Sequence, residues 1–156
     1  MATNLIQNPS FESGVLAPWT SHAANVAEVV ASNAEYQAFE GDYYLDLQTA
    51  VGNRGNTVSQ VITGLTPGVT YTVSIQTRTR GEGAASYCST YLYTGNNATA
   101  GAIASLVDTP NEWFTLSGEY TAKTESETLN VVGGCTFSGS SYTGHVLFDE
   151  VVFREA

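Results

Sequence analysis

The sequence predicts an all-β protein, an antiparallel two-sheet β-sandwich of the jelly-roll type with about ten strands. Short segments in which apolar and polar residues alternate recur along the chain, with turn signals roughly every 8 to 12 residues. No stretch of the sequence has the period of about 3.6 residues that marks an amphipathic helix. With 156 residues the chain is long enough to bury a core, and we expect residues 1–156 to form one domain.

Each expected strand is a run rich in Val, Ile, Thr, Tyr or Phe that is bounded by Gly, Pro, Asn or Ser. Leu65–Gly68 is a tight turn, because Pro67 fixes its own φ and Gly68 permits a positive φ. Gly133–Gly144 is expected to be a long Ser/Gly loop, and Asp149-Glu150 interrupts the last strand. In chain order the expected strands are Asn4–Ile6, Asn25–Ala31, Tyr43–Leu47, Thr57–Ile62, Tyr71–Arg80, Tyr87–Tyr93, Ala102–Val107, Glu112–Thr121, Thr128–Val132 and Val146–Arg154.

The segment from Tyr71 to Tyr93 is expected to be a hairpin of two long strands joined by the Gly-rich segment Gly81–Ala85. Apolar and polar side chains alternate in each strand, so that the hairpin has one dry face and one wet face. The dry face is expected to hold Tyr71, Val73, Ile75, Cys88 and Leu92. The wet face is expected to hold Gln76, Arg78, Arg80, Tyr87, Tyr91 and Tyr93.

The side chains of this wet face are suited to binding a sugar. Aromatic rings can stack on the apolar C–H patches of a sugar, while amide and guanidinium groups bond to its hydroxyls. Trp113 and Tyr142 are further candidates for this surface, whereas Trp19 is expected in the core. Two alternatives stay open, because the tyrosines could pack against each other across strands and the arginines could serve to solubilise an exposed sheet.

The charge of the chain restricts its partners. The formal net charge is −10, which repels nucleic acids and anionic membranes and favours a neutral ligand. No apolar run is long enough to cross a membrane. Charged residues are 13% of the chain, and the surface is rich in Ser, Thr, Asn and Tyr instead. We therefore expect a secreted protein in which Met1-Ala2 stands in place of a removed signal, with a cytoplasmic location as the alternative.

The two cysteines, Cys88 and Cys135, permit one disulfide. We expect this bond to tie the second strand of the hairpin to a later strand or loop. The alternative is a pair of buried free thiols, since free cysteines are commonly buried.

Three motifs together resemble a known family. They are Asn4–Glu12 with Trp19, the stretch from Ser59–Val61 through Gly64–Gly68 to Tyr71–Ser74, and Phe148–Val151. Their order and spacing resemble the carbohydrate-binding modules of families 4, 9, 16 and 22, which are galactose-binding-like jelly rolls. The cysteine pair and the Ser/Thr-rich surface are most similar to the variants on fungal secreted proteins.

The resemblance implies a glycan-binding cleft on the concave face of one sheet. It also implies a structural calcium ion where the first and last strands meet, away from the cleft. The positions that match the calcium ligands are Glu12 and Asp149, with backbone carbonyls near Asn8 and Gly41 and with Asp42 as further candidates. Carboxylates and carbonyls are the usual calcium ligands. The alternative is that these acidic residues are solvated or cap turns.

We expect a non-catalytic module that binds a neutral polysaccharide or oligosaccharide of the β-glucan or xylan type, and we expect no catalytic residues. Such a module is expected to be a monomer, in some proteins fused to a catalytic domain. One alternative is a jelly-roll polysaccharide lyase that uses Tyr91, Arg78, Gln76 and His145. Another is a structural or adhesive extracellular domain. The sequence has no nucleophile, phosphate-loop or paired-histidine motif, and we expect His22 and His145 to lie on the surface or to have structural roles.

Overall fold

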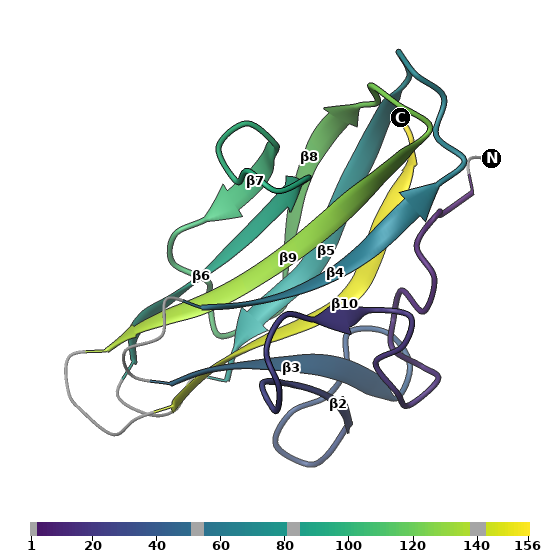
Figure 1. Ribbon diagram of the computed structural model, residues 1–156. Coiled ribbons are helices and arrows are strands. Elements are labelled where there is room, and N and C mark those ends of the chain that lie inside the picture. The colour runs from purple at the N-terminus through teal and green to yellow at the C-terminus, as the bar shows by residue number, and fades with distance from the viewer. Residues whose placement is uncertain (1–2, 51–54, 81–84, 138–142) are drawn as a thin grey trace.

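The structure is a computed structural model that describes residues 3–50, 55–80, 85–137 and 143–156. These residues form ten β-strands and include no helix that could cross a membrane (Figure 1). The strands are β1 (Thr20–Ser21), β2 (Ala27–Ala31), β3 (Tyr43–Ala50), β4 (Asn56–Thr63), β5 (Thr70–Thr79), β6 (Ala85–Thr94), β7 (Ala102–Leu106), β8 (Phe114–Thr121), β9 (Ser126–Phe137) and β10 (Thr143–Glu155).

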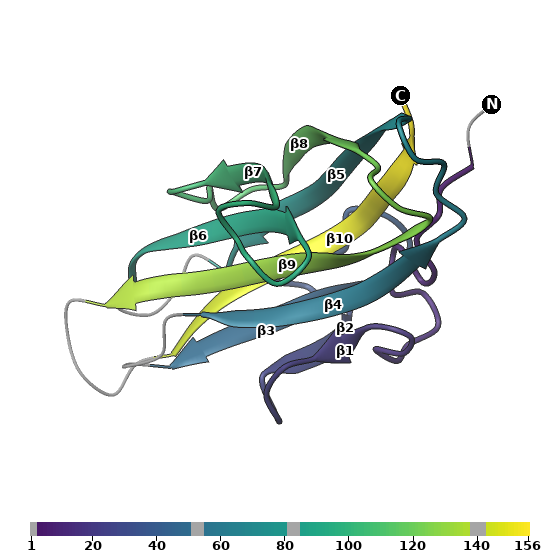
Figure 2. The ribbon, with the colours of Figure 1, turned by 45° about the horizontal axis from the view of Figure 1, so that its top comes forward.

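The strands form two antiparallel sheets of five strands each. Sheet A has the order β1-β4-β9-β6-β7, and sheet B has the order β2-β3-β10-β5-β8. The two sheets lie as layers, with β4, β9 and β6 in front of β3, β10 and β5 in the view of Figure 2. The predicted two-sheet sandwich is therefore confirmed.

The expected hairpin of Tyr71–Tyr93 is wrong, because its two strands belong to different sheets. β5 pairs with β10 and β8, whereas β6 pairs with β9 and β7. Alternation in the sequence identifies the apolar face of a strand but not the strand that pairs with it. Here Val73 and Ile75 of β5 and Leu92 of β6 point into the same core from opposite sheets. The predicted dry face is correct, although two sheets share it.

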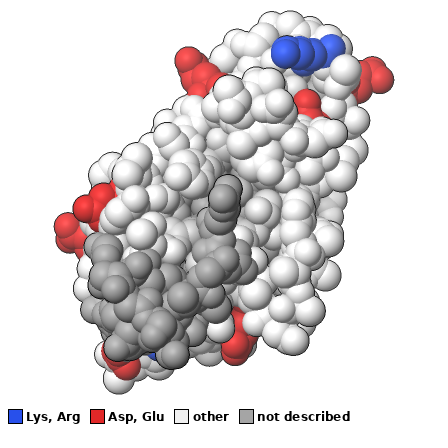
Figure 3. Space-filling view, turned by 60° about the vertical axis from the view of Figure 1, so that its left-hand side comes forward, with Lys and Arg blue, Asp and Glu red and all other residues white. Residues whose placement is uncertain are grey.

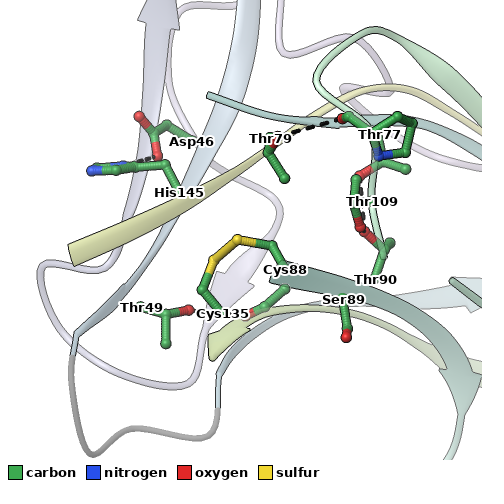
Figure 4. Close-up of a disulfide and its surroundings, with 12 residues drawn as sticks. Asp46, Thr49, Thr77, Thr79, Cys88, Ser89, Thr90, Thr109, Cys135 and His145 are labelled. Atoms are coloured by element: carbon green, nitrogen blue, oxygen red, sulfur yellow. Dashed lines mark hydrogen bonds and ion pairs between the residues drawn. A yellow bond between two sulfur atoms is a disulfide. The ribbon is translucent and has the colours of Figure 1, made fainter. Parts of the chain in front are cut away.

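The core between the sheets is mostly apolar, and its buried polar side chains include a short chain of threonines. Its largest fully buried side chains include Phe148 and Phe153 of β10. Thr77 of β5 and Thr90 of β6 form a hydrogen bond of 2.9 Å across the interior, and Thr109 continues the chain at 3.0 Å. All three threonines are buried, and Figure 4 shows Thr90 pointing toward Thr77. A polar pair that bonds internally avoids the cost of an unsatisfied buried hydroxyl.

A disulfide joins Cys88 of β6 to Cys135 of β9. The two residues are direct partners in the β6–β9 ladder, so the bond ties neighbouring strands of one sheet. The predicted bridge is confirmed (Figure 4).

The N-terminal segment differs from its prediction. Asn4–Ile6 forms no strand, but Leu5 donates its N–H to Phe153 O at 2.8 Å. The side chain of Asn4 accepts from Phe153 N and donates to Val151 O, so it takes the place of a regular backbone ladder beside β10. The two-residue strand β1 was not predicted, since a strand that short has no periodic pattern.

β9 is longer than predicted and runs through the first part of the expected Ser/Gly loop. Gly133 belongs to this strand because the neighbouring sheet approaches it closely. A Cβ at this position would lie 3.0 Å from Val146 Cβ and 3.1 Å from Phe148 Cζ. The glycine here therefore indicates close packing of the sheets rather than a loop.

β10 contains the predicted interruption at Asp149-Glu150. Glu150 has a positive φ of 46°, and the register with β5 shifts between Asp149 and Val152. This shift is a β-bulge, in which one strand has more residues than its partner. The bulge turns the last strand close to the N-terminal segment, where Val151 N donates to Pro9 O at 2.9 Å.

Candidate functional site

The outer face of sheet A carries the three tyrosines that the sequence singled out. Cys88, Thr90 and Leu92 of β6 point into the core, so the alternate residues Tyr87, Ser89, Tyr91 and Tyr93 face outward. In the close-up of Figure 4, Ser89 points away from sheet B. Tyr87 and Tyr91 are 42% and 41% exposed, so both rings are accessible on this face.

The strand register places outward residues in rows across this sheet. Tyr91 lies opposite Val132 of β9, which lies opposite Thr57 of β4. The next row joins Tyr93 to Asn130 and Ser59 in the same way. Each row therefore combines a tyrosine with smaller, mostly polar side chains.

A groove of about 650 Å³ lies on this face. Its lining includes Tyr91, Tyr93, Val132 and Thr57, together with residues of β7 and the segment before it. This segment rises beside the tyrosines and forms one wall of the groove. A groove with a mostly apolar lining, two tyrosine rings and a few hydroxyl groups has the form of a small-ligand site.

Among the residues that the structure describes, those that point outward from β4, β6 and β9 carry no formal charge. The described outward residues of β4, β6 and β9 are Thr57, Ser59, Val61, Thr63, Tyr87, Ser89, Tyr91, Tyr93, Ser126, Thr128, Asn130, Val132, Gly134 and Thr136. Charged side chains are also sparse in the view of Figure 3 and lie mostly toward its margin. The described lining of the groove is therefore made of uncharged side chains.

Gln76, Arg78, Arg80 and Trp113 lie on the opposite side of the molecule, on the outer face of sheet B. The expectation that Gln76, Arg78 and Arg80 share a face with the tyrosines is therefore wrong. It failed because the two predicted hairpin strands are in different sheets. Tyr142 lies outside the described residues.

The two arginines hold another part of the chain in place. Arg78 Nη2 donates to the backbone and side-chain oxygens of Asn111 at 3.0 and 2.7 Å. Its guanidinium lies 5.1 Å from the centre of the Tyr36 ring, and that of Arg80 lies 5.6 Å from the same ring. Arg80 also lies 3.5 Å from a carboxylate oxygen of Asp46. Tyr36 and its neighbours are thereby held against sheet B by cation–π contacts.

Gln76 and Trp113 also have partners within the protein. Gln76 Nε2 donates to Thr115 Oγ1 at 2.7 Å, and Trp113 Nε1 donates to Gln37 O at 3.0 Å. Their contact with a ligand stays a prediction. Trp19, by contrast, is buried beside Phe11 with ring centres 6.0 Å apart, which confirms its place in the core.

The residues of the lyase alternative are not brought together. Tyr91 lies on the outer face of sheet A, whereas Gln76, Arg78 and His145 belong to sheet B. His145 Nδ1 is 2.7 Å from Asp46 Oδ1. A base and its helper groups on opposite faces cannot act on one substrate atom.

The family model of CBM_4_9, a carbohydrate binding domain, matches residues 3–132. The chain belongs to this family. No curated protein sequence matches the chain. The match covers β1 to β8 and most of β9, and so includes every strand that carries the groove.

Solved structures of other carbohydrate-binding domains share the fold. TmCBM61, in complex with β-1,4-galactotriose, is 19% identical with a TM-score of 0.69, and 99% of each chain is covered. The CBM22-1–GH10 modules of Clostridium thermocellum xylanase 10B, complexed with xylohexaose, are 16% identical with a TM-score of 0.68. There the match covers 100% of this chain and 29% of the longer one. The CBM22-1 xylan-binding domain from Paenibacillus barcinonensis is 18% identical, with a TM-score of 0.66 and coverage of 99% and 95%.

A second cluster in this carbohydrate-binding domain lies where the N-terminal segment meets the bulge of β10. Asp149 is fully buried, and its two oxygens accept from Glu40 N and Glu150 N at 2.8 Å each. Glu12 accepts from Asp42 N at 2.8 Å and Tyr43 N at 2.9 Å.

The pKa of Asp149 is raised to about 7, chiefly by burial and also by the nearby charge of Glu12, against the effect of its two N–H donors. A cation between these two carboxylates would offset both the burial and the repulsion. The donor set, oxygens only, also fits calcium.

The other predicted calcium ligands, Gly41, Asn8 and Asp42, differ in their surroundings. Gly41 lies so close to Glu12 that a Cβ built at Gly41 would collide with the Glu12 carboxyl group. The carbonyl of Asn8 already accepts from Trp19 Nε1 at 3.2 Å and Phe11 N at 3.4 Å, and Asp42 is exposed. No three His, Cys, Asp or Glu side chains of the described ranges are placed to hold a metal ion. Backbone carbonyls would have to complete the coordination of an ion at Glu12 and Asp149.

Sequence reasoning missed the contribution of β4 and β9 to the groove face. Thr57, Ser59, Asn130 and Val132 are far apart in the chain and only the β4–β9 pairing brings them together. Thr57, Ser59 and Asn130 are polar and Val132 is apolar, and together they form no distinctive sequence pattern. The one available signal was the alternation within β4, where Val58 and Ile62 face the core and leave Thr57 and Ser59 outside.

Proposed function

We propose that this chain is a non-catalytic module that binds a neutral polysaccharide or oligosaccharide on the outer face of sheet A. The observation that carries the proposal is the groove beside Tyr91, with its exposed aromatic ring and a lining in which every described side chain is uncharged. An aromatic ring offers a flat apolar surface to the C–H face of a sugar. The hydroxyl and amide groups of the neighbouring rows can bond to sugar hydroxyls.

The ligand class follows from the charge of the groove and of the whole chain. A neutral chain of the xylan or β-glucan type fits both, whereas the net charge of −10 opposes uronate polymers. The complexes of similar modules with xylohexaose and β-1,4-galactotriose support a neutral, linear ligand. β-1,4-Galactan is therefore an additional candidate.

The module works, in this proposal, as an accessory that brings other activities to a glycan. The xylanase 10B structure, in which a similar module shares a chain with a GH10 module, supports such an arrangement. The disulfide supports a secreted location, since disulfides persist in oxidising compartments. The module itself is a monomer.

Calcium has a structural role in the same proposal. Glu12 and Asp149 would hold the ion, with backbone carbonyls near Gly41 completing its shell. The ion would supply positive charge between two carboxylates and so fix the N-terminal segment against β10. It lies apart from the groove and takes no part in sugar binding.

Replacement of Tyr91 tests the proposal. We expect Tyr91→Ala to weaken retention on the preferred polysaccharide by about tenfold or more, because truncation of an aromatic anchor in an interface costs on the order of 1–2 kcal/mol. Affinity electrophoresis in gels with xylan, β-glucan, mannan or β-1,4-galactan measures the effect. Thermal stability should change little, since the ring is 41% exposed.

Phe114→Ala is the matched control, because Phe114 is a similarly exposed aromatic residue, at 44%, in the edge strand of the other sheet. It should leave retention unchanged. If wild-type protein is not retained by any of these polysaccharides, or if both variants bind as wild type does, the proposal is wrong. Release of reducing ends or of unsaturated products during the assay would show an enzyme instead.

A further inference from the structure

A chain of hydrogen bonds runs across the outer face of sheet A, beside the tyrosine groove. It begins at Asn130, which is only 2% exposed. Asn130 Nδ2 donates to the carbonyls of Tyr93 and Gly95 at 3.3 and 2.7 Å. These two bonds fix the orientation of the amide, so that Oδ1 is the atom that faces Ser59.

The orientation of Asn130 determines the state of His22. Ser59 donates its single hydroxyl proton to Asn130 Oδ1 at 2.6 Å. Ser59 Oγ can therefore only accept in its second contact, a distance of 2.7 Å to His22 Nε2. The proton of a neutral His22 must accordingly lie on Nε2, which leaves Nδ1 as a hydrogen-bond acceptor.

His22 has the position and the exposure to use this acceptor. Its ring is exposed, and within the described ranges no group donates a hydrogen bond to Nδ1. Its backbone N–H donates at 3.0 Å to Thr57 O, and Thr57 lines the groove beside Tyr91. Ser59, which its ring contacts, lines a second cavity of about 280 Å³ with Thr20, Val61 and Thr128. His22 thus stands between the two cavities.

The two cavities follow each other along the same strands. Val132 borders the first and Thr128 the second, and four residues of a strand span roughly 13 Å. A ligand that fills both must be longer than a single sugar ring. Val61, 63% exposed in the second cavity, offers an apolar contact to a sugar C–H face.

We infer that the cavity at β1 and β4 is an additional sugar subsite, and that His22 Nδ1 accepts a hydrogen bond from a hydroxyl of the sugar bound between it and the tyrosine groove. This inference rests on the proposed glycan binding and extends it. The bond is directional, since the fixed tautomer presents an acceptor and no donor at Nδ1. His22 is therefore a specificity residue for a free hydroxyl at this position of the chain.

Two substitutions separate the proposed role from a structural one. Asn places its Oδ1 where Nδ1 of histidine lies but does not reach Ser59. Gln reaches Ser59 with its amide but has no acceptor at the Nδ1 position. The sugar contact thus predicts that His22→Gln is the more harmful change for binding, while a role in positioning Ser59 predicts the reverse.

The measurement is affinity electrophoresis in xylan, β-glucan and β-1,4-galactan gels, in mildly alkaline buffer that keeps imidazole neutral. On whichever polysaccharide retains wild type most strongly, His22→Gln should weaken binding about two- to tenfold, the range for one net hydrogen bond. His22→Asn should bind closer to wild type, and the melting temperature of the Gln variant should stay unchanged.

Tyr91→Ala in the same gels distinguishes failure of this inference from failure of the proposed function. If Tyr91→Ala loses retention while His22→Gln binds as tightly as wild type, or more tightly than His22→Asn, the subsite is wrong and the glycan-binding function stands. If wild type is retained neither in these three gels nor in a mannan gel, the proposed function fails and the subsite fails with it.

Discussion

The carboxyl group of Asp149 lies in a position where a negative charge is energetically unfavourable. It is fully buried in the bulge of β10, and burial is the main reason why its pKa is raised to about 7. Two backbone N–H donors offset only part of this cost, and Glu12 nearby adds repulsion. A bound divalent cation would reverse the balance, because it favours the ionised form of both carboxyl groups.

Calcium should therefore raise the melting temperature of the protein. At a calcium concentration about 100 times the dissociation constant, binding to the folded state adds about 2.7 kcal/mol, which corresponds to roughly 5–10 °C for a domain of this size. Differential scanning calorimetry of chelator-treated protein, with and without added calcium, measures the shift.

Glu12→Gln should remove most of this calcium-induced shift, and Glu28→Gln, at an exposed carboxylate of β2, should leave it intact. Magnesium should have a much smaller effect, since it resists losing its own water ligands. Equal melting temperatures in chelator and in calcium would contradict the proposed ion.

Single residues were predictable from sequence where their role depends on local chemistry. Cys88 and Cys135 pair as expected, and Trp19 is in the core. Arg78 and Arg80 were assigned to a ligand surface because alternation placed them on the wet face of the expected hairpin, beside the tyrosines. Their actual partner Tyr36 lies more than 40 residues away, and only the folded chain brings it over sheet B.

At the scale of elements, β9 shows how a glycine can be misread. Gly133 suggested a loop, yet it lies in a strand at the closest approach of the two sheets. A side chain there would press on Val146 and Phe148 of β10, both of which are fully buried. The packing between sheets therefore requires a residue without a Cβ.

Gly133→Ala should lower the free energy of unfolding by about 1–3 kcal/mol, the usual cost of overpacking a well-filled core. Thr136→Ala, at an exposed position of the same strand, should change it by less than about 0.5 kcal/mol. Urea unfolding followed by tyrosine and tryptophan fluorescence measures both values. If the Gly133 variant is as stable as wild type, the two sheets can move apart locally with little loss of folding free energy.

Strands as elements were mostly predictable, whereas their partners were not. Nine of the expected segments recur as strands, because alternation reports which residues face a core. β5 and β6 were expected to pair with each other, but alternation is satisfied equally well when each strand buries its apolar face from a different sheet. For this reason the candidate site in the structure differs from the one expected from the sequence. It keeps the tyrosines of β6, and Thr57, Ser59 and Asn130 take the place of the arginines.

At the scale of the whole molecule, the disulfide closes a loop between residues separated by 47 positions. On the chain-entropy model, such a cross-link stabilises the fold by about 4 kcal/mol, chiefly by restricting the unfolded chain. The double variant Cys88→Ala, Cys135→Ala should lose approximately this amount in urea unfolding.

Glycan retention of the folded double variant should stay within about twofold of wild type, because backbone pairing between β6 and β9 still positions Tyr91. A variant that remains folded and yet loses retention would show that the disulfide shapes the groove directly. Reduced wild-type protein provides a second comparison with the same covalent sequence.

The architecture of the molecule was predictable because its pattern is distributed over the whole chain. Short alternating segments, frequent turns and the absence of a helical period together favour a sandwich. The position of the groove was not predictable from the sequence, since it depends on the order of strands in sheet A and on the segment before β7 that forms its wall.

Both ends of the chain lie at one end of the molecule and meet at β10, in sheet B (Figure 1). The proposed glycan lies on sheet A. When such a module anchors a larger protein to a polymer, any pulling force enters through one sheet and leaves through the other. The force is then transmitted between the two sheets through the apolar core. It does not break the hydrogen bonds of a single strand pair one after another. Within sheet A, the bond between Cys88 and Cys135 joins the strand of Tyr91 to its neighbour covalently, so that these two strands stay linked at this position under load.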